Sequence, residues 1–181
     1  MHTTTLNLQK LCKVWGYMKY HHPAFLLGMK SWDDEFFALY AKVDGASGAD
    51  ETNEILCGWV RDFGDIDEYV IKRHYWAKSP PEDMDVQADK TWLTDEAYLS
   101  APLSAELLRV DAVDAIVTPR APNTFWSGYS NFANESYHIE PELILNDKYR
   151  PARIMDYGDA AFRFLGLFRV WNAIEYHSNS T

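Results

Sequence analysis

The residues best suited to hold a metal are the six histidines, and their spacing does not favour a site. His21 and His22 are adjacent, so they point to different faces of a helix, and neither has a Cys, Asp or His three or four residues away. Glu175 and His177 are two residues apart and do not share a helix face. Two further histidines stand alone in the sequence, His74 and His138. We therefore expect no metal and no cofactor, unless residues far apart in the chain assemble a site.

Nucleophilic catalysis needs a serine beside its base and an oxyanion site, and no such pattern occurs. The chain has no Gly-x-Ser-x-Gly and no Ser-x-x-Lys, and Ser127 before Gly128 is interpreted as a turn residue. The nine glycines are scattered, so no phosphate-binding loop is expected. Acidic pairs such as Asp33 and Asp34 are interpreted as helix caps. The sequence therefore names no reaction, and a hydrolase in its own right is the least favoured hypothesis.

Composition indicates one globular domain over residues 1–181, with 47% hydrophobic and 15% aromatic residues. The net charge of −10 argues against nucleic acid as a partner, because phosphate binding needs clustered Lys and Arg. No run approaches the roughly 20 apolar residues of a membrane span, and the first residues lack the pattern of a signal peptide. Cys12 and Cys57 lie in apolar helical contexts, so we favour two buried thiols over one disulfide.

One segment near the start of the chain recurs near its end. Residues 11–21 and 167–177 share Leu, a basic residue, Val, Trp, Tyr and His at a constant offset, with Trp15 and Trp171 as the matched tryptophans. Both copies carry an apolar stripe at helical spacing, widened by extra aromatics, so each is expected to be a helix buried on more than one side. Chance similarity is the alternative, but an offset that stays constant over eleven positions favours duplication of a helical unit. We expect the last helix to dock beside the first as a pseudo-symmetric pair, with Trp171 and Ile174 either packed on the first repeat or exposed as a patch.

Three helices with short turns are expected in residues 5–64, which favours an antiparallel bundle. The first ends at Pro23, the second follows an N-cap at Ser31 and runs to about Val43, and the third ends at Gly64.

The second half of the chain is less regular. Residues 65–118 are expected to hold a loop and a helix capped by Ser104, with a further helix possible at Glu68–Trp76. Alternating β-prone residues on both sides of a Gly-containing turn predict a hairpin within 123–139. A final helix is expected over 157–177, capped by Asp156. The predicted fold class is therefore mainly α, an antiparallel helical bundle with a small β-hairpin element.

Five segments, in this order, carry a resemblance to a known family. They read LCKVWGYMKYHHP, SWDDEFF, ADKTWLTDEAYLSAPLSAELL, NFANESY and MDYGDAAFRFLGLFRVWNAIEYH. Together they span nearly the whole chain, which resembles the N-terminal helical region of bacterial tail-specific (C-terminal processing) serine peptidases. The resemblance implies a periplasmic or envelope location, with a PDZ-like module and a catalytic domain as partners. It also implies that the nucleophilic serine and its lysine base lie in a later domain with no counterpart here.

The expected function is that of a non-catalytic accessory domain of such a peptidase, with a structural or polypeptide-substrate-binding role. The alternative is a stand-alone, envelope-associated module that binds peptide or glycan through exposed aromatics. An all-structural role for these aromatics, as plain core, also stays open. The candidate peptide-binding residues are Trp15, Tyr17, Tyr20, Trp126, Trp171 and Tyr176.

Overall fold

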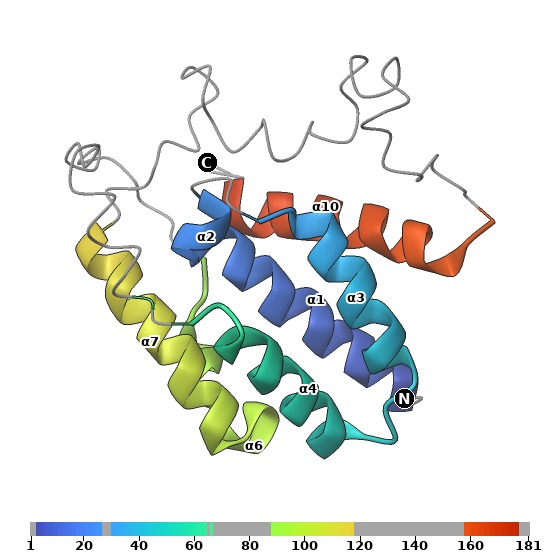
Figure 1. The fold of residues 1–181 in the computed structure, drawn as a ribbon, viewed down its shortest axis with the longest axis horizontal. Coiled ribbons are helices and arrows are strands. Elements are labelled where there is room, and N and C mark those ends of the chain that lie inside the picture. Colours follow the sequence, from blue (N-terminus) through green and yellow to red (C-terminus); the bar gives the residue numbers. More distant parts are fainter. Residues whose placement is uncertain (1–2, 27–29, 65, 67–87, 118–157, 178–181) are drawn as a thin grey trace, which may run out of the picture.

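The computed structural model describes residues 3–26, 30–64, 66, 88–117 and 158–177, and every regular element among them is a helix (Figure 1). The expectation of a mainly α-helical bundle is confirmed. The hairpin expected at 123–139, with Trp126 and Ser127, lies outside the described residues, as do the possible helix at Glu68–Trp76 and the cap at Asp156. The elements in chain order are α1 (Thr3–His21), α2 (Pro23–Leu26), α3 (Trp32–Asp44), α4 (Ala49–Arg61), the 3-10 helix η1 (Thr91–Thr94), α6 (Glu96–Leu99), α7 (Ala101–Val117) and α10 (Ala160–His177).

Helix α1 is the centre of the bundle, in contact with α2, α3, α4, α7 and α10 (Figure 1). Leu11, Val14, Trp15 and Met18 have no exposed surface, and even the amine-bearing Lys19 is buried. The prediction that this helix is buried on more than one side is confirmed. It ends at His21 because Pro23 disfavours the helical conformation of the residue before it.

The helix ends follow from local chemistry, with two differences from the sequence-based expectations. Ser31 caps α3 as predicted, since its Oγ accepts a hydrogen bond from the Asp34 amide at 3.4 Å. Ser104 does not cap α7: it lies inside the helix and its hydroxyl donates to the Leu93 carbonyl. Asp159 stands just before α10, and its carboxylate accepts from the Ala161 amide at 2.7 Å.

The direction of the helices only partly fits an antiparallel bundle. Helix α3 runs back along α1, and α4 runs back along α3, as short connections require (Figure 1). Helix α10 instead runs in the same direction as α1 (Figure 1).

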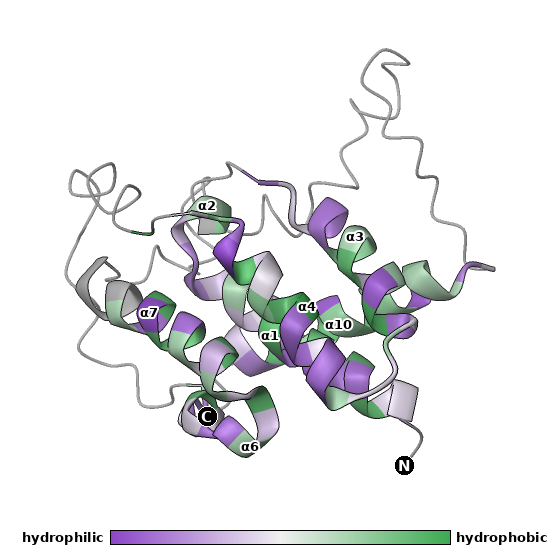
Figure 2. Ribbon diagram, turned by 60° about the horizontal axis from the view of Figure 1, so that its bottom comes forward, coloured by the Kyte–Doolittle hydropathy of each residue, from purple (hydrophilic) through white to green (hydrophobic). Residues whose placement is uncertain are grey.

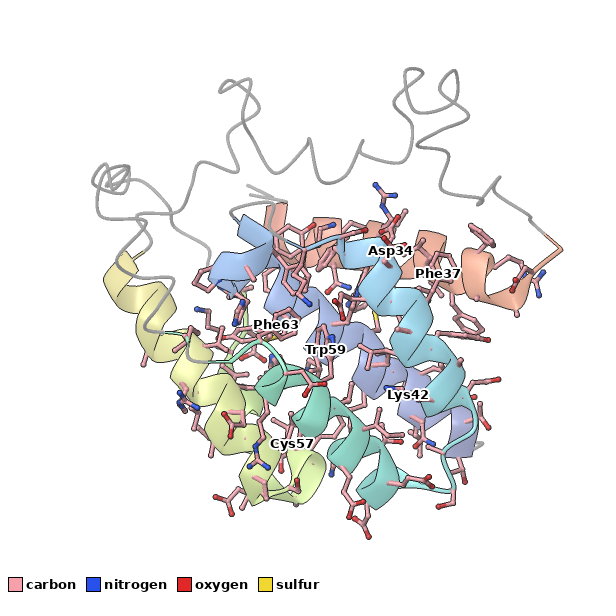
Figure 3. All side chains as sticks on the ribbon, viewed as in Figure 1. Asp34, Phe37, Lys42, Cys57, Trp59 and Phe63 are labelled. Atoms are coloured by element: carbon pink, nitrogen blue, oxygen red, sulfur yellow. The ribbon has the colours of Figure 1, made fainter. Side chains whose placement is uncertain are left out.

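Side chains sort by polarity around the bundle. Hydrophilic and hydrophobic residues alternate along α4, as expected for a helix with one covered and one open side (Figure 2). Trp59 and Phe63 are buried with the core, while Lys42 lies exposed on α3 (Figure 3). Among the described helices, none combines the length and apolar character needed to span a bilayer.

Candidate interaction surface

Helices α1 and α10 approach most closely where Gly16 meets Asn172. A Cβ atom at Gly16 would lie 1.7 Å from Asn172 Oδ1, so only glycine leaves room for this side chain. Asn172 is buried, and its Nδ2 donates to the carbonyl oxygens of Phe168 at 2.9 Å and of Cys12 at 3.2 Å. The two helices are thus joined by close backbone packing and a buried amide. The prediction that the last helix docks beside the first is confirmed.

The docked pair is in register. Gly16 and Asn172 occupy matching positions of the sequence repeat, and so do Tyr20 and Tyr176, whose rings stack with centroids 4.8 Å apart. Matching positions that meet along two helices running in the same direction indicate a pseudo-two-fold relation, with its axis between the helices. The structural repeat therefore agrees with the sequence repeat.

Helix α3 covers the tryptophan side of α1. The Trp15 and Trp32 rings stack with centroids 4.2 Å apart, and the Trp15 indole Nε1 donates to the Trp32 carbonyl at 3.1 Å. Phe36, four residues further along α3, meets the Trp15 ring edge-on at 5.5 Å. The two aromatic residues of α3, spaced four apart, therefore enclose Trp15.

Helix α3 also contacts α10, through aromatic and charged groups. Phe37 lies on α3 toward α10, where its ring meets Phe162 at a centroid distance of 4.8 Å (Figure 3). Arg169 of α10 pairs with the nearly buried Asp33 of α3 at 3.5 Å. Lys19 lies nearby, with its Nζ 4.2 Å from the centroid of the Trp32 ring. Burial, and secondarily the charge of Arg169, holds the pKa of Lys19 well below its usual range, while Asp33 acts in the opposite direction.

The other side of α10 carries an apolar stripe that is more than half exposed. Its members are 58–61% exposed and follow the spacing i, i+3, i+4, i+7: Leu167, Val170, Trp171 and Ile174. Their repeat counterparts on α1 are each 0% exposed: Leu11, Val14, Trp15 and Met18. The expectation that the final helix is buried on more than one side is thus wrong for the described structure, because α1 and α3 both pack on one side of it. We call these four α10 residues the α10 stripe.

The structure divides the sequence-predicted aromatic candidates between interior and surface. Trp15, Tyr17 and Tyr20 lie inside the bundle and present no surface to a peptide in this conformation. Tyr176 is partly covered by Tyr20, and Trp171 is open to solvent. Of the two outcomes expected for Trp171 and Ile174, the structure shows the exposed patch, and Leu167 and Val170 extend it.

The histidines and thiols beside the core have structural surroundings. The buried His22 accepts the Ala24 amide hydrogen on Nδ1 at 3.1 Å, and burial lowers its pKa to about 4. The pocket beside it is too small for a ligand larger than water. Burial raises the pKa of Cys12 to about 12 and raises that of Cys57, and both are free thiols, as predicted. No group of three or more His, Cys, Asp or Glu that could hold a metal occurs among the described residues.

Comparison of the chain with protein-family models, with curated proteins and with solved structures found no match. The resemblance to tail-specific serine peptidases therefore stays a prediction, and the functional conclusions below rest on the geometry of α1, α3 and α10.

Proposed function

We propose that this chain is a non-catalytic helical domain whose work is to dock another polypeptide segment on the α10 stripe. The observation that carries the proposal is the contrast between the two repeat copies: the stripe is more than half exposed, and its counterpart on α1 is fully enclosed. Contiguous exposed apolar side chains are uncommon on a monomer and mark interaction sites. A centrally placed tryptophan is also the residue type most enriched among interface hot spots.

In the wider protein, the docked segment belongs to a tail-specific serine peptidase of the bacterial envelope, for which this chain is the accessory N-terminal region. This part of the proposal is supported by the sequence resemblance alone. The same part of the proposal includes a small β element at 123–139, the PDZ-like and catalytic domains as partners, and polypeptide as substrate.

The alternative is a stand-alone envelope module that binds peptide or glycan through exposed aromatics. Trp171 supports it, since an exposed indole is the platform on which sugar rings stack. The neighbours of Trp171 favour peptide over glycan, because Leu167, Val170 and Ile174 are aliphatic and offer no hydrogen-bond partners for hydroxyl groups.

Labelling with a fluorophosphonate probe tests whether the chain carries an activated serine nucleophile. We expect no covalent adduct on the 181-residue chain by intact mass, with a serine protease labelled in parallel as the positive control. A stoichiometric adduct would contradict the proposal.

The peptidase assignment is tested by reading the gene past the codon for Thr181. An in-frame catalytic domain supports the assignment, and a stop codon favours the stand-alone module.

A further inference from the structure

We infer that the α10 stripe binds an amphipathic helix with two aromatic side chains four residues apart, arranged as α3 is on α1. This rests on the proposed docking function and adds the chemistry of the occupant. The inference rests on the in-register pair α1 and α10. On α1 the face that carries Trp15 is covered by α3, and on α10 the matching face, which carries Trp171, is exposed.

Applied to the α1–α3 contact, the pseudo-two-fold relation predicts an equivalent helix packed on α10. Trp15 is enclosed by Trp32 and Phe36, at 4.2 and 5.5 Å between ring centroids. Trp171 is the repeat counterpart of Trp15 and is 58% exposed. An occupant with the Trp-x-x-x-Phe spacing of α3 would enclose Trp171 in the same way, because side chains four residues apart lie on one helix face.

A second exposed residue fits the same relation. On α3, Phe37 reaches past α1 to pack on Phe162 of α10 at 4.8 Å. The repeat counterpart of Phe162 on α1 is Leu6, which is 48% exposed. Leu8, the counterpart of Phe164, is buried, so the surface that would receive an α3-like helix is open on α10 and, on α1, at Leu6.

Charge refines the description of the occupant. Asp33 of α3 pairs with Arg169 of α10 at 3.5 Å, and its charge also acts on Lys19 of α1. The repeat counterparts of these two bases are Lys13 and the exposed acid Glu175, so a helix docked on α10 would meet one base and one acid where α3 meets two bases. The residue after its first aromatic is therefore expected to be neutral instead of aspartate.

A second copy of the chain fits the stripe less well. The net charge of −10 opposes self-association. Four side chains on one helix are also few beside the roughly 20 residues per partner of a standard stable interface. A single amphipathic helix needs no more than one such stripe.

The test uses a synthetic peptide of residues 30–45, carrying Asp33→Asn and a fluorescein label, titrated with the full chain while anisotropy is followed. We expect a saturable rise that weakens at least about tenfold with Trp171→Ala. Leu108→Ala is the matched control, since Leu108 is a large exposed apolar residue on α7 outside the stripe, and it should leave binding unchanged. Phe36→Ala in the peptide should also abolish saturation.

The outcomes separate the inference from the function it rests on. A flat titration, or equal binding by the Trp171→Ala variant, overturns the α3-like occupant. Sedimentation velocity on the same samples then decides the rest. A concentration-dependent dimer abolished by Trp171→Ala would replace the helix with a second copy while the docking function stands, whereas a stoichiometric fluorophosphonate adduct would remove the non-catalytic docking function itself.

Discussion

Gly16→Ala tests the contact that sets the register of the two repeat helices. The added Cβ would lie 1.7 Å from Oδ1, 2.1 Å from Cγ and 2.5 Å from Nδ2 of Asn172, all far inside van der Waals contact. Asn172 has little freedom to move, because it is 2% exposed and its amide donates to two carbonyl oxygens. We therefore expect the substitution to push α10 away from α1, although alanine is the better helix former.

The expected magnitude follows from three opposing contributions. Overpacking costs about 1–3 kcal/mol, and loss of the hydrogen bond from Asn172 to the Cys12 carbonyl costs about 1 kcal/mol, while the bond to Phe168 lies within α10 and is kept. Replacing a mid-helix glycine by alanine returns about 1 kcal/mol. The net loss in the free energy of unfolding should be about 1–3 kcal/mol. In an Asn172→Ala background all three clashing atoms are absent, so Gly16→Ala should become neutral or stabilising by about 1 kcal/mol.

The assay is urea unfolding followed by circular dichroism, run as a double-mutant cycle on the wild type, both single variants and the double variant. Hydrogen exchange of the α10 amides shows whether that helix is released first. A coupling free energy of about 3 kcal/mol is expected between positions 16 and 172. A coupling within about 0.5 kcal/mol of zero would refute the close in-register packing of α1 and α10.

Three further expectations concern the core, the surface and pH. Trp15→Ala should lower the free energy of unfolding by about 3–5 kcal/mol, while Trp171→Ala should change it by less than about 0.5 kcal/mol, both measured in urea; equal losses would contradict the opposite burial of the two repeat copies. The pKa of His22 is lowered from 6.5 to about 4, so its contribution to stability is complete above pH 6.5 and is lost as the pH falls toward 4. Between pH 7 and pH 5 this amounts to about 2 kcal/mol, and His22→Asn should reduce the acid loss seen in urea titrations by that amount. Cys12, with a pKa raised to about 12, and the buried Cys57 should react with dithiodipyridine far more slowly in the folded chain than in urea, and rapid labelling of the native protein would contradict their burial.

Local patterns predicted much of the fold. Ser31 with three acids behind it fixed the start of α3, and the Pro23 break fixed the end of α1. Ser104 was assigned as a cap because serine there is typical of a helix start, but the preceding Ala101 and Pro102 already fit a first turn. The Ser104 hydroxyl instead donates a hydrogen bond to the Leu93 carbonyl of η1, a contact between two elements that depends on how η1 folds back on α7.

The candidate surface was only half predictable, for a physical reason. Similar apolar stripes on two helices indicate that each helix can be buried. Which element buries each stripe depends on other helices, either later in the chain or from a partner. Trp15 is enclosed because α3 returns along α1 after a short connection. Trp171 keeps the same chemistry and the same place in its helix, yet its exposure depends on a neighbour that its own sequence cannot specify. The contrast between two stripes of the same spacing is therefore more informative than exposure alone, and the proposed docking of a further helix rests on this contrast, with Gly16 and Asn172 holding the pair in register.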